Sequence, residues 1–535
     1  MAGISYLEDL RTWVVATESS TYALRLNEED APSHVYWGPS LTAAQVAELD
    51  VKTLPWWDGF NDPNEGLDEL AADGGTRYWT PALQVRFSGP ARALEWRYLS
   101  YEITSDDRAA ELRLDLADRH YPLRITLHYR VPHGTDVIER WTVLTADEDV
   151  EVFRADSATW ALPVREDYRL SHVTGRWAAE TQLSRVPAAH GETVFASRRG
   201  VTGHHANPWV MIDDGAATED HGEIYGFALA WSGSWRITTT RSSTGRLTVS
   251  GGFGQDGVVH QVGPGKSLTT PVFAGLYTRG GFGAASRAWH TYALGHVLPH
   301  PDELRPVLYN SWEATGFDVT EAGQKALAEK AANLGVELFV MDDGWFGART
   351  GDHAGLGDWQ VNPERFPDGL KPLVDAVHGF GMKFGIWVEP EMVNPDSDLY
   401  RAHPDWVLHQ PNRTRSELRR QLVLNFARPD VAAWAHGWLD ALVGDHGIDF
   451  LKWDMNRPFS EAGWPGEPDP DRLWVEHTRA VHALMDRLRA DHPGLRIEAC
   501  SGGGGRIDLG VLARTDQVWT SDNTDALDRL RIQHG

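Results

Sequence analysis

The chain of 535 residues has a single cysteine and few basic residues. Cys500 alone excludes an internal disulfide and any zinc site built from cysteine pairs. Acidic residues outnumber basic ones by 76 to 50, and the net charge of −26 repels phosphate, so we expect no nucleic-acid partner. The sequence lacks an apolar run of the roughly 18 residues that a membrane span needs, and its acidic N-terminal segment lacks a signal peptide's apolar core. We therefore expect a soluble, cytoplasmic protein without a membrane partner.

Short β-strands are predicted for about the first 280 residues. Apolar and polar residues alternate along 122–131, a turn follows at 132–136, and a second strand over 137–144 completes a predicted hairpin. Many short strands separated by turns are typical of a large antiparallel β-sandwich. Further runs of this kind occur at 76–87, 224–231, 235–240 and 246–249.

Strands and helices alternate from about residue 300 onward. Thr320 is expected to cap a helix that Gly335 ends, Gly381 ends a second helix, and Pro429 begins a third. Such alternation predicts a parallel sheet with the spacing of a (β/α)8 TIM-type barrel. The expected strands are 307–312, 337–343, 383–389, 449–454, 496–500 and 517–522.

The predicted fold is multidomain. The expected strands supply about six of the eight βα units of a closed barrel, so we expect an incomplete barrel and a chain that is a fragment of a longer protein. The predicted parts are an N-terminal antiparallel β-sandwich over 1–280, a linker helix over 281–300 and the catalytic (β/α) barrel over 301–535.

Acidic side chains follow most of the predicted barrel strands, where the active sites of this architecture lie. Clustered carboxylates suit a glycoside hydrolase, in which two of them flank a positively charged transition state. Asp454 is the candidate nucleophile, because Lys452 lies on the same face of the strand and favours its ionised form. Asn456 is expected to donate to a substrate hydroxyl. Taken alone, this motif fits an ion pair that only stabilises a loop equally well.

Asp522 is the candidate general acid and base. Trp519 lies close to it in sequence, and desolvation by the indole would favour the protonated form that an acid needs. Asp525 and Glu391 are alternatives for this role. Capping of the following helix would explain Asp522 and Asp525 equally well.

Two further motifs allow more than one interpretation. Asp342 and Asp343 suit a hard metal ion, but no third ligand has a recognisable spacing, so we expect them to bind vicinal sugar hydroxyls. The glycines of 502–505 resemble a phosphate-binding loop without its Gly-Lys-Ser/Thr ending, and their expected role is close backbone approach to a ligand. Cys500 is either an ordinary buried residue or part of the same pocket.

A set of motifs follows a fixed order along nearly the whole chain. It begins with Tyr36-Trp-Gly-Pro39 in the N-terminal β region. It continues with Tyr309-Asn-Ser-Trp-Glu313, Met341-Asp-Asp-Gly-Trp-Phe346, Gly357-Asp-Trp359, Ile386-Trp-Val-Glu-Pro-Glu-Met392, Lys452-Trp-Asp-Met-Asn-Arg457, Cys500-Ser-Gly-Gly-Gly-Gly505 and Ser521-Asp522. Together these motifs resemble glycoside hydrolase family 36, the melibiase-type α-galactosidases.

The resemblance implies a role for each candidate residue. Asp454 would be the nucleophile and Asp522 the general acid/base of a retaining double displacement, which needs two carboxyl groups about 5–5.5 Å apart. Trp312 and Trp387 would form the walls of the sugar pocket. The residues implied to bind the sugar are Asp342, Asp343, Arg419 (with Arg420 beside it as an alternative), Lys452, Asn456, Cys500, Gly502 and Gly503.

The resemblance also implies an activity and an assembly. We expect an exo-acting α-galactosidase that hydrolyses melibiose and raffinose-type oligosaccharides as a homotetramer, without a metal or an organic cofactor. In some family members a loop of a neighbouring N-terminal domain completes the site, and an acid within Asp58–Asp73 would do so here. The open alternatives are an α-N-acetylgalactosaminidase, a transglycosidase, and a catalytically incompetent carbohydrate-binding fragment.

Overall fold

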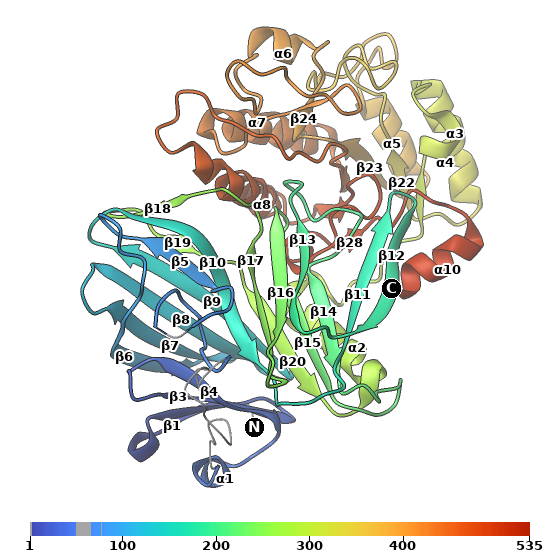
Figure 1. The fold of residues 1–535 in the computed structure, drawn as a ribbon. Helices are drawn as coiled ribbons and strands as arrows, with labels where there is room; N and C mark the ends of the chain where they lie inside the picture. The colour runs from blue at the N-terminus through green and yellow to red at the C-terminus, as the bar shows by residue number, and fades with distance from the viewer. Residues whose placement is uncertain (1–2, 50–65, 76) are drawn as a thin grey trace.

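The computed structural model describes residues 3–49, 66–75 and 77–535, and antiparallel sheets make up its N-terminal part (Figure 1). These sheets confirm the predicted antiparallel class of this region. The first sheet has four strands in chain order, β1 (Gly3–Leu7), β2 (Thr12–Ala16), β3 (Ser20–Leu26) and β4 (Pro32–Pro39), and the short helix α1 (Ala43–Ala47) follows it.

A ten-stranded and a six-stranded antiparallel sheet bury a common core. Leu112 of the larger sheet and Val249 of the smaller one belong to the same buried cluster. The larger sheet comprises β6 (Trp96–Ser105), β7 (Ala109–Asp118), β8 (Leu123–Pro132), β9 (Val137–Ala146), β11 (Arg169–Arg176), β12 (Ala179–Pro187), β14 (Trp209–Asp213), β15 (Ile224–Leu229), β19 (Leu268–Thr269) and β20 (Phe273–Thr278). The smaller sheet comprises β5 (Leu83–Arg86), β10 (Val150–Ala161), β13 (Gly191–Ser197), β16 (Trp235–Arg241), β17 (Leu247–Phe253) and β18 (His260–Val262).

The predicted hairpin is present as β8 and β9, which pair from Leu123 with Ala146 onward. Burial alternates along most of β8, because one face of the strand packs on the core and the other does not. Of the predicted run at 76–87, residue 76 lies outside the described residues, residues 77–82 are irregular, and the strand β5 forms only near the end. A helix lies in the expected linker, where α2 (Gly281–Tyr292) continues into a π-helical turn at Ala293–Val297.

The alternating part of the chain forms one six-stranded parallel sheet. Its strands pair in chain order, as the alternation predicted. Thr320 caps α4 (Glu321–Asn333) through its side chain, and Pro429 is the first residue of α7 (Pro429–His446). The strands are β21 (Leu308–Asn310), β22 (Leu338–Met341), β23 (Lys383–Val388), β26 (Phe450–Trp453), β27 (Arg496–Ala499) and β28 (Gln517–Val518), with β24 (Met392–Val393) and β25 (Leu422–Val423) paired separately.

Helices connect these strands. Among the described helices, none is both long and apolar enough to cross a membrane. The helices are α3 (Trp312–Thr315), α4 (Glu321–Asn333), α5 (Lys371–Gly379), α6 (Asp398–Ala402), α7 (Pro429–His446), α8 (Leu473–Asp491), α9 (Leu509–Leu512) and α10 (Ala526–His534), with single 3-10 turns at Glu8–Leu10 and Pro470–Arg472.

The first strand of the sheet differs from the prediction. The first strand ends at Asn310 rather than Trp312, because the Asn310 side chain accepts a hydrogen bond from the Trp312 amide and the chain turns into α3. Among the described residues, β21 and β28 each pair with one neighbour, so the sheet is open. The number of strands agrees with the expected six, whereas the incomplete TIM-type barrel itself stays a prediction.

The hairpin β11–β12 joins the antiparallel part to the end of the parallel sheet. β12 packs against α10, and Figure 1 places the two side by side near the C-terminus. Farther along, His204 Nε2 lies 2.7 Å from the carbonyl oxygen of Gly502. These contacts bring residues of the N-terminal part to the C-terminal ends of the parallel strands.

Candidate active site

A cavity of about 550 Å³ opens at the C-terminal ends of the parallel strands. It collects side chains from both parts of the chain, including Trp177 from the β11–β12 turn. The predicted residues that line it are Trp312, Asp342, Asp343, Trp387, Arg419, Lys452, Asp454, Asn456 and Asp522.

Asp454 follows β26 and is buried at the base of this cavity. Its Oδ2 accepts hydrogen bonds from Trp387 Nε1 at 3.0 Å and Asn456 Nδ2 at 2.7 Å, and its Oδ1 accepts one from the Gly502 amide at 3.1 Å. Burial raises the pKa of Asp454, but the Lys452 ammonium and these donors outweigh it and hold the pKa below its ordinary value. The carboxylate is thus kept ionised, as a nucleophile requires.

Two of these contacts refine the predicted roles. The Asn456 amide donates a hydrogen bond to Asp454, whereas the sequence predicted a hydrogen bond to a substrate hydroxyl. Trp387 lines the cavity and donates to the same oxygen of Asp454. Both side chains therefore orient the carboxylate.

Lys452 connects Asp454 to the predicted sugar-binding pair. Its Nζ donates to Asp342 Oδ2 at 2.8 Å, and Asn310 Nδ2 donates to the same oxygen at 2.6 Å. Burial lowers the pKa of Lys452, yet the carboxylates of Asp342 and Asp454 raise it well above its ordinary value, so the ammonium stays charged. Removal of either partner of this buried ion pair would leave an uncompensated buried charge.

Asp343 is held by an arginine that the motifs did not indicate. Arg349 Nε and NH2 donate to both oxygens of Asp343, at distances between 2.8 and 3.1 Å, and Arg349 is itself buried. Burial raises the pKa of Asp343 despite this ion pair. The adjacent carboxylates are thus neutralised by one cation each, an arrangement that suits binding of neutral hydroxyl groups better than binding of a metal ion.

Asp522 lines the cavity, is half-buried and lies between two indoles. Trp519 Nε1 donates to its Oδ1 at 3.0 Å, and Trp177 Nε1 donates to its Oδ2 at 2.9 Å. Trp519 is therefore a hydrogen-bond donor and not only a desolvating wall. The alternatives to Asp522 have other tasks: Asp525 caps α10, and the buried Glu391 pairs with Arg506.

The glycine-rich loop after β27 contacts the residues that line the cavity. Cys500 is buried, and its thiol is hydrogen-bonded to Asp454, although Cys500, Gly502 and Gly503 are not part of the cavity lining. A Cβ at Gly503, where φ is +80°, would lie 2.8 Å from the backbone nitrogen of Asp522. At Gly503 the close approach is thus between two protein segments, and the approach to a ligand that the sequence predicted for these glycines stays a prediction.

Arg419 and Glu389 complete the surroundings of Asp454. Arg419 lines the cavity, whereas the Arg420 carbonyl accepts a hydrogen bond from Asn394, so the structure distinguishes the two neighbouring arginines. Glu389 is fully buried, and burial together with the charge of Asp454 raises its pKa to about 8.

No cluster of metal ligands lies at this cavity among the residues that the structure describes. Within these residues, one group of three potential metal-ligating side chains occurs, at His436, and it lies outside the cavity. In the acidic stretch Asp58–Asp73, the acids up to residue 65 lie outside the described residues, and Asp68 pairs with Arg77.

Some lining residues were missed by the sequence interpretation. Trp177 lies 345 positions from its partner Asp522, and no local pattern marks it. Asn310 and Glu313 belong to a motif that was recognised, but no role was assigned to them. The missed lining residues are Trp177, Leu308, Tyr309, Asn310, Glu313, Arg349 and Thr524.

Comparison with known proteins places both parts of the chain in one family. The Melibiase family model matches residues 267–535, and the glycosyl hydrolase family 36 N-terminal domain matches residues 30–259. The chain belongs to glycoside hydrolase family 36. It is therefore a glycoside hydrolase, and the resemblance drawn from the motifs is confirmed.

Similar proteins cover nearly the whole chain. The α-galactosidase AgaA of Geobacillus stearothermophilus is 34% identical over 99% of this chain and 77% of its own. The crystal structure of the α-galactosidase from Lactobacillus brevis has a TM-score of 0.94 at 33% identity, over 99% of this chain and 75% of that one. A variant of AgaA in complex with raffinose has a TM-score of 0.92 at 34% identity, over 98% of this chain and 77% of that one.

Proposed function

We propose that this chain is a retaining exo-α-galactosidase that releases terminal galactose from raffinose-type oligosaccharides. The observation that carries the proposal is the pair of carboxylates in one cavity with contrasting surroundings. Asp454 is buried, and its pKa lies below its ordinary value, whereas Asp522 lines the same cavity and is only half-buried. A double displacement requires one permanently ionised carboxylate and one that exchanges protons.

Each step has a residue in place. An oxygen of Asp454 attacks the anomeric carbon as Asp522 gives a proton to the departing glycosidic oxygen, which leaves galactose bonded to Asp454. Asp522 then takes a proton from water, the water oxygen displaces Asp454, and galactose leaves with its original configuration. Hydrogen bonds to Asp454 from Trp387 and Asn456 keep the carboxylate oriented for both steps.

The rest of the cavity supports recognition of a single galactose unit. Asp342 and Asp343 present carboxylates neutralised by Lys452 and Arg349, and acceptors of this kind bind sugar hydroxyls. Trp312 offers a partly exposed indole as one wall, and Arg419 lines the same cavity. Proteins with similar folds were crystallised with raffinose and stachyose, which agrees with an oligosaccharide substrate.

The domain organisation and assembly belong to the same proposal. We assign residues 1–280 to a β-sandwich domain, 281–300 to a linker and 301–535 to the catalytic barrel, in a homotetramer. Light scattering of the purified chain tests the tetramer. No observation in the structure favours an α-N-acetylgalactosaminidase or a chain that only binds carbohydrate.

The test is release of nitrophenol from para-nitrophenyl α-galactoside by the purified chain. Asp454→Ala should lower kcat by roughly 10⁴-fold or more. Added azide should restore turnover and give the galactosyl azide of inverted, β configuration. Asp525→Asn is the matched control, because Asp525 caps α10 outside the cavity, and it should keep normal activity. Full activity in Asp454→Ala, or turnover only of the N-acetylgalactosaminide, would contradict the proposal.

A further inference from the structure

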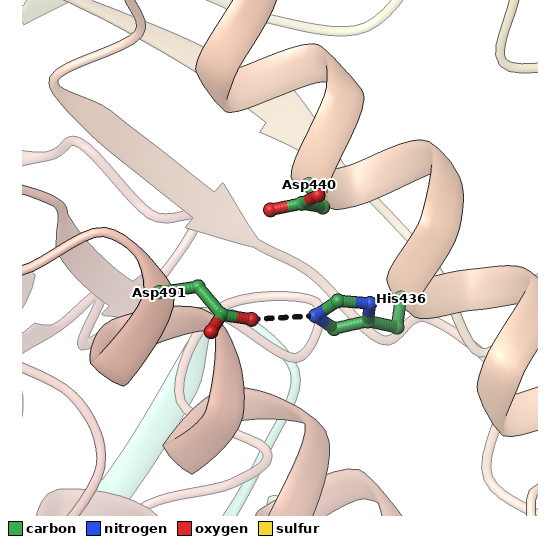
Figure 2. Close-up of side chains that lie close together, drawn as sticks. All are labelled: His436, Asp440 and Asp491. Carbon is green, nitrogen blue, oxygen red and sulfur yellow. Dashed lines mark hydrogen bonds and ion pairs between the residues drawn. The ribbon is translucent and has the colours of Figure 1, made fainter.

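Two helices that flank β26 bring potential metal ligands together away from the active cavity. His436 and Asp440 lie one turn apart on the same face of α7, and Asp491 is the last residue of α8. Figure 2 shows the His436 imidazole facing Asp491 across the gap between the helices, with Asp440 on the next turn beside them. One ligand atom from each of these three residues lies within 4.8 Å of the other two.

A fourth side chain, that of His492, extends the group. His436 Nε2 lies 2.9 Å from Asp491 Oδ2, and His492 Nε2 lies 2.7 Å from Asp440 Oδ1. Asp491 of α8 is thus paired with the imidazole of His436 on α7. Asp440 of α7 is paired with the imidazole of His492, the residue that follows α8. Imidazole nitrogen and carboxylate oxygen are the ligands that Zn²⁺ combines in proteins.

We propose that His436, Asp440 and Asp491 bind one zinc ion that fastens α7 to α8. His492, which contacts Asp440 but lies outside this group of three, would turn toward the ion to supply the fourth ligand. Ligand atoms lie about 2.0–2.2 Å from bound zinc, and tetrahedral angles place any two of them about 3.3–3.6 Å apart. Because the three ligand atoms lie within 4.8 Å of one another, they have at most about 1.5 Å to close when the ion binds. The Asp440 and Asp491 side chains are 47% and 42% exposed, so an ion from solution reaches them.

The local charge favours a divalent cation. Two carboxylates face two imidazoles, which are neutral when they bind metal. Arg487 Nε lies 3.6 Å from Asp491 Oδ2 and offsets one negative charge. A bound dication would offset the negative charge that remains on this group of residues, in a protein whose net charge is −26.

The position indicates a structural role. α7 leads into β26 and α8 follows it, so an ion between them fastens the two helices on either side of the strand that ends at Asp454. None of the four ligands lines the active cavity, so the ion takes no part in the chemistry. The expectation of an active site without a metal is unchanged.

The experiment uses the full chain after treatment with a chelator and titrates it with Zn²⁺ alone. Competition with a chromophoric chelator gives the affinity, elemental analysis gives the stoichiometry, and a melting curve gives the stability. We expect one zinc ion per chain and a higher Tm. In Asp440→Asn, which keeps the size of the side chain, affinity should fall by about 10–100-fold, while galactosidase activity without added zinc stays unchanged.

The matched control is Asp449→Asn, which alters the separate His378–Asp449 pair on the same part of the chain. This variant should bind zinc as the wild type does. X-ray absorption of the bound zinc should show imidazole scattering. Absence of zinc binding to the wild type, or equal binding by wild type and Asp440→Asn, would overturn the assignment and leave two ordinary ion pairs between the helices.

Discussion

Trp177 Nε1 donates a hydrogen bond to Asp522 Oδ2 over 2.9 Å, although 345 positions separate the two residues. Trp177 lies in the turn between β11 and β12, and its side chain is 60% exposed because it projects into the cavity. Trp519 occupies the other oxygen of Asp522. The N-terminal part of the chain therefore supplies one of the two indole hydrogen bonds to the proposed general acid.

Trp177→Phe should reduce kcat/KM on raffinose by roughly 10–100-fold, since a hydrogen bond to a charged group contributes about 1.5–3 kcal/mol. The loss should be smaller on para-nitrophenyl α-galactoside, whose leaving group needs less help from an acid. Trp79→Phe is the control, because Trp79 is also partly exposed in the β-sheet part but lines a different cavity. An equal loss on both substrates would argue against a role through Asp522.

Gly503→Ala should disturb Asp522 through the backbone. The added Cβ would lie 2.8 Å from the Asp522 nitrogen and 3.0 Å from Ser521 Cα, at a φ of +80° that alanine disfavours. A displacement of about 1 Å in a catalytic group lowers the rate by about 10²-fold. Gly494→Ala, whose Cβ would contact nothing within 4 Å, should retain full activity. Steady-state rates and circular dichroism of both variants check this, and an unaffected Gly503→Ala would show that the loop yields.

Much of the fold follows from local patterns. The alternation along β8, the Thr320 cap and the Pro429 start each depend on neighbours in sequence, and the structure contains all three. The acidic residues at the ends of the predicted strands also indicated the position of the site, because parallel strands in one sheet bring their C-terminal ends to one edge. Asp342 and Asp454 meet at Lys452 for this reason.

The remainder depends on tertiary contacts that no local pattern encodes. Arg349 reaches Asp343 from an irregular segment, and Trp177 reaches Asp522 from another sheet. The direction of the Asn456 amide, which turns to Asp454, is decided by the nearest buried charge rather than by strand periodicity. Such contacts exist only in the folded chain, so the sequence alone does not indicate them.

Lys452→Met should shift the pH dependence of catalysis. Burial raises the pKa of Asp454 and Lys452 lowers it, with a net pKa below the ordinary value, so removal of the ammonium must raise that pKa. Asp454 then stays protonated to higher pH, and the acidic limb of the plot of kcat/KM against pH should shift to higher pH. Lys371→Met, which removes an exposed ion pair on α5, should leave the profile in place. An unshifted acidic limb in Lys452→Met would contradict the electrostatic role of Lys452.

Glu389→Gln should change how stability depends on pH. Burial and the charge of Asp454 raise the pKa of Glu389 to about 8, whereas an unfolded glutamate titrates near 4.3. Between these values the folded chain holds a proton that the unfolded chain has lost, so the contribution of Glu389 to stability falls with rising pH, by about 1.4 kcal/mol per pH unit. The loss ends above the folded pKa, where both states are ionised.

Glutamine keeps the shape of the protonated side chain but cannot ionise, so the Tm of Glu389→Gln should fall less than that of the wild type between pH 6 and about 8. Glu329→Gln, which alters an exposed residue of α4, should follow the wild-type curve. Melting curves recorded across this range decide the matter. If the Glu389→Gln curve ran parallel to that of the wild type, Glu389 would have to be ionised in the folded protein, with a second negative charge buried beside Asp454.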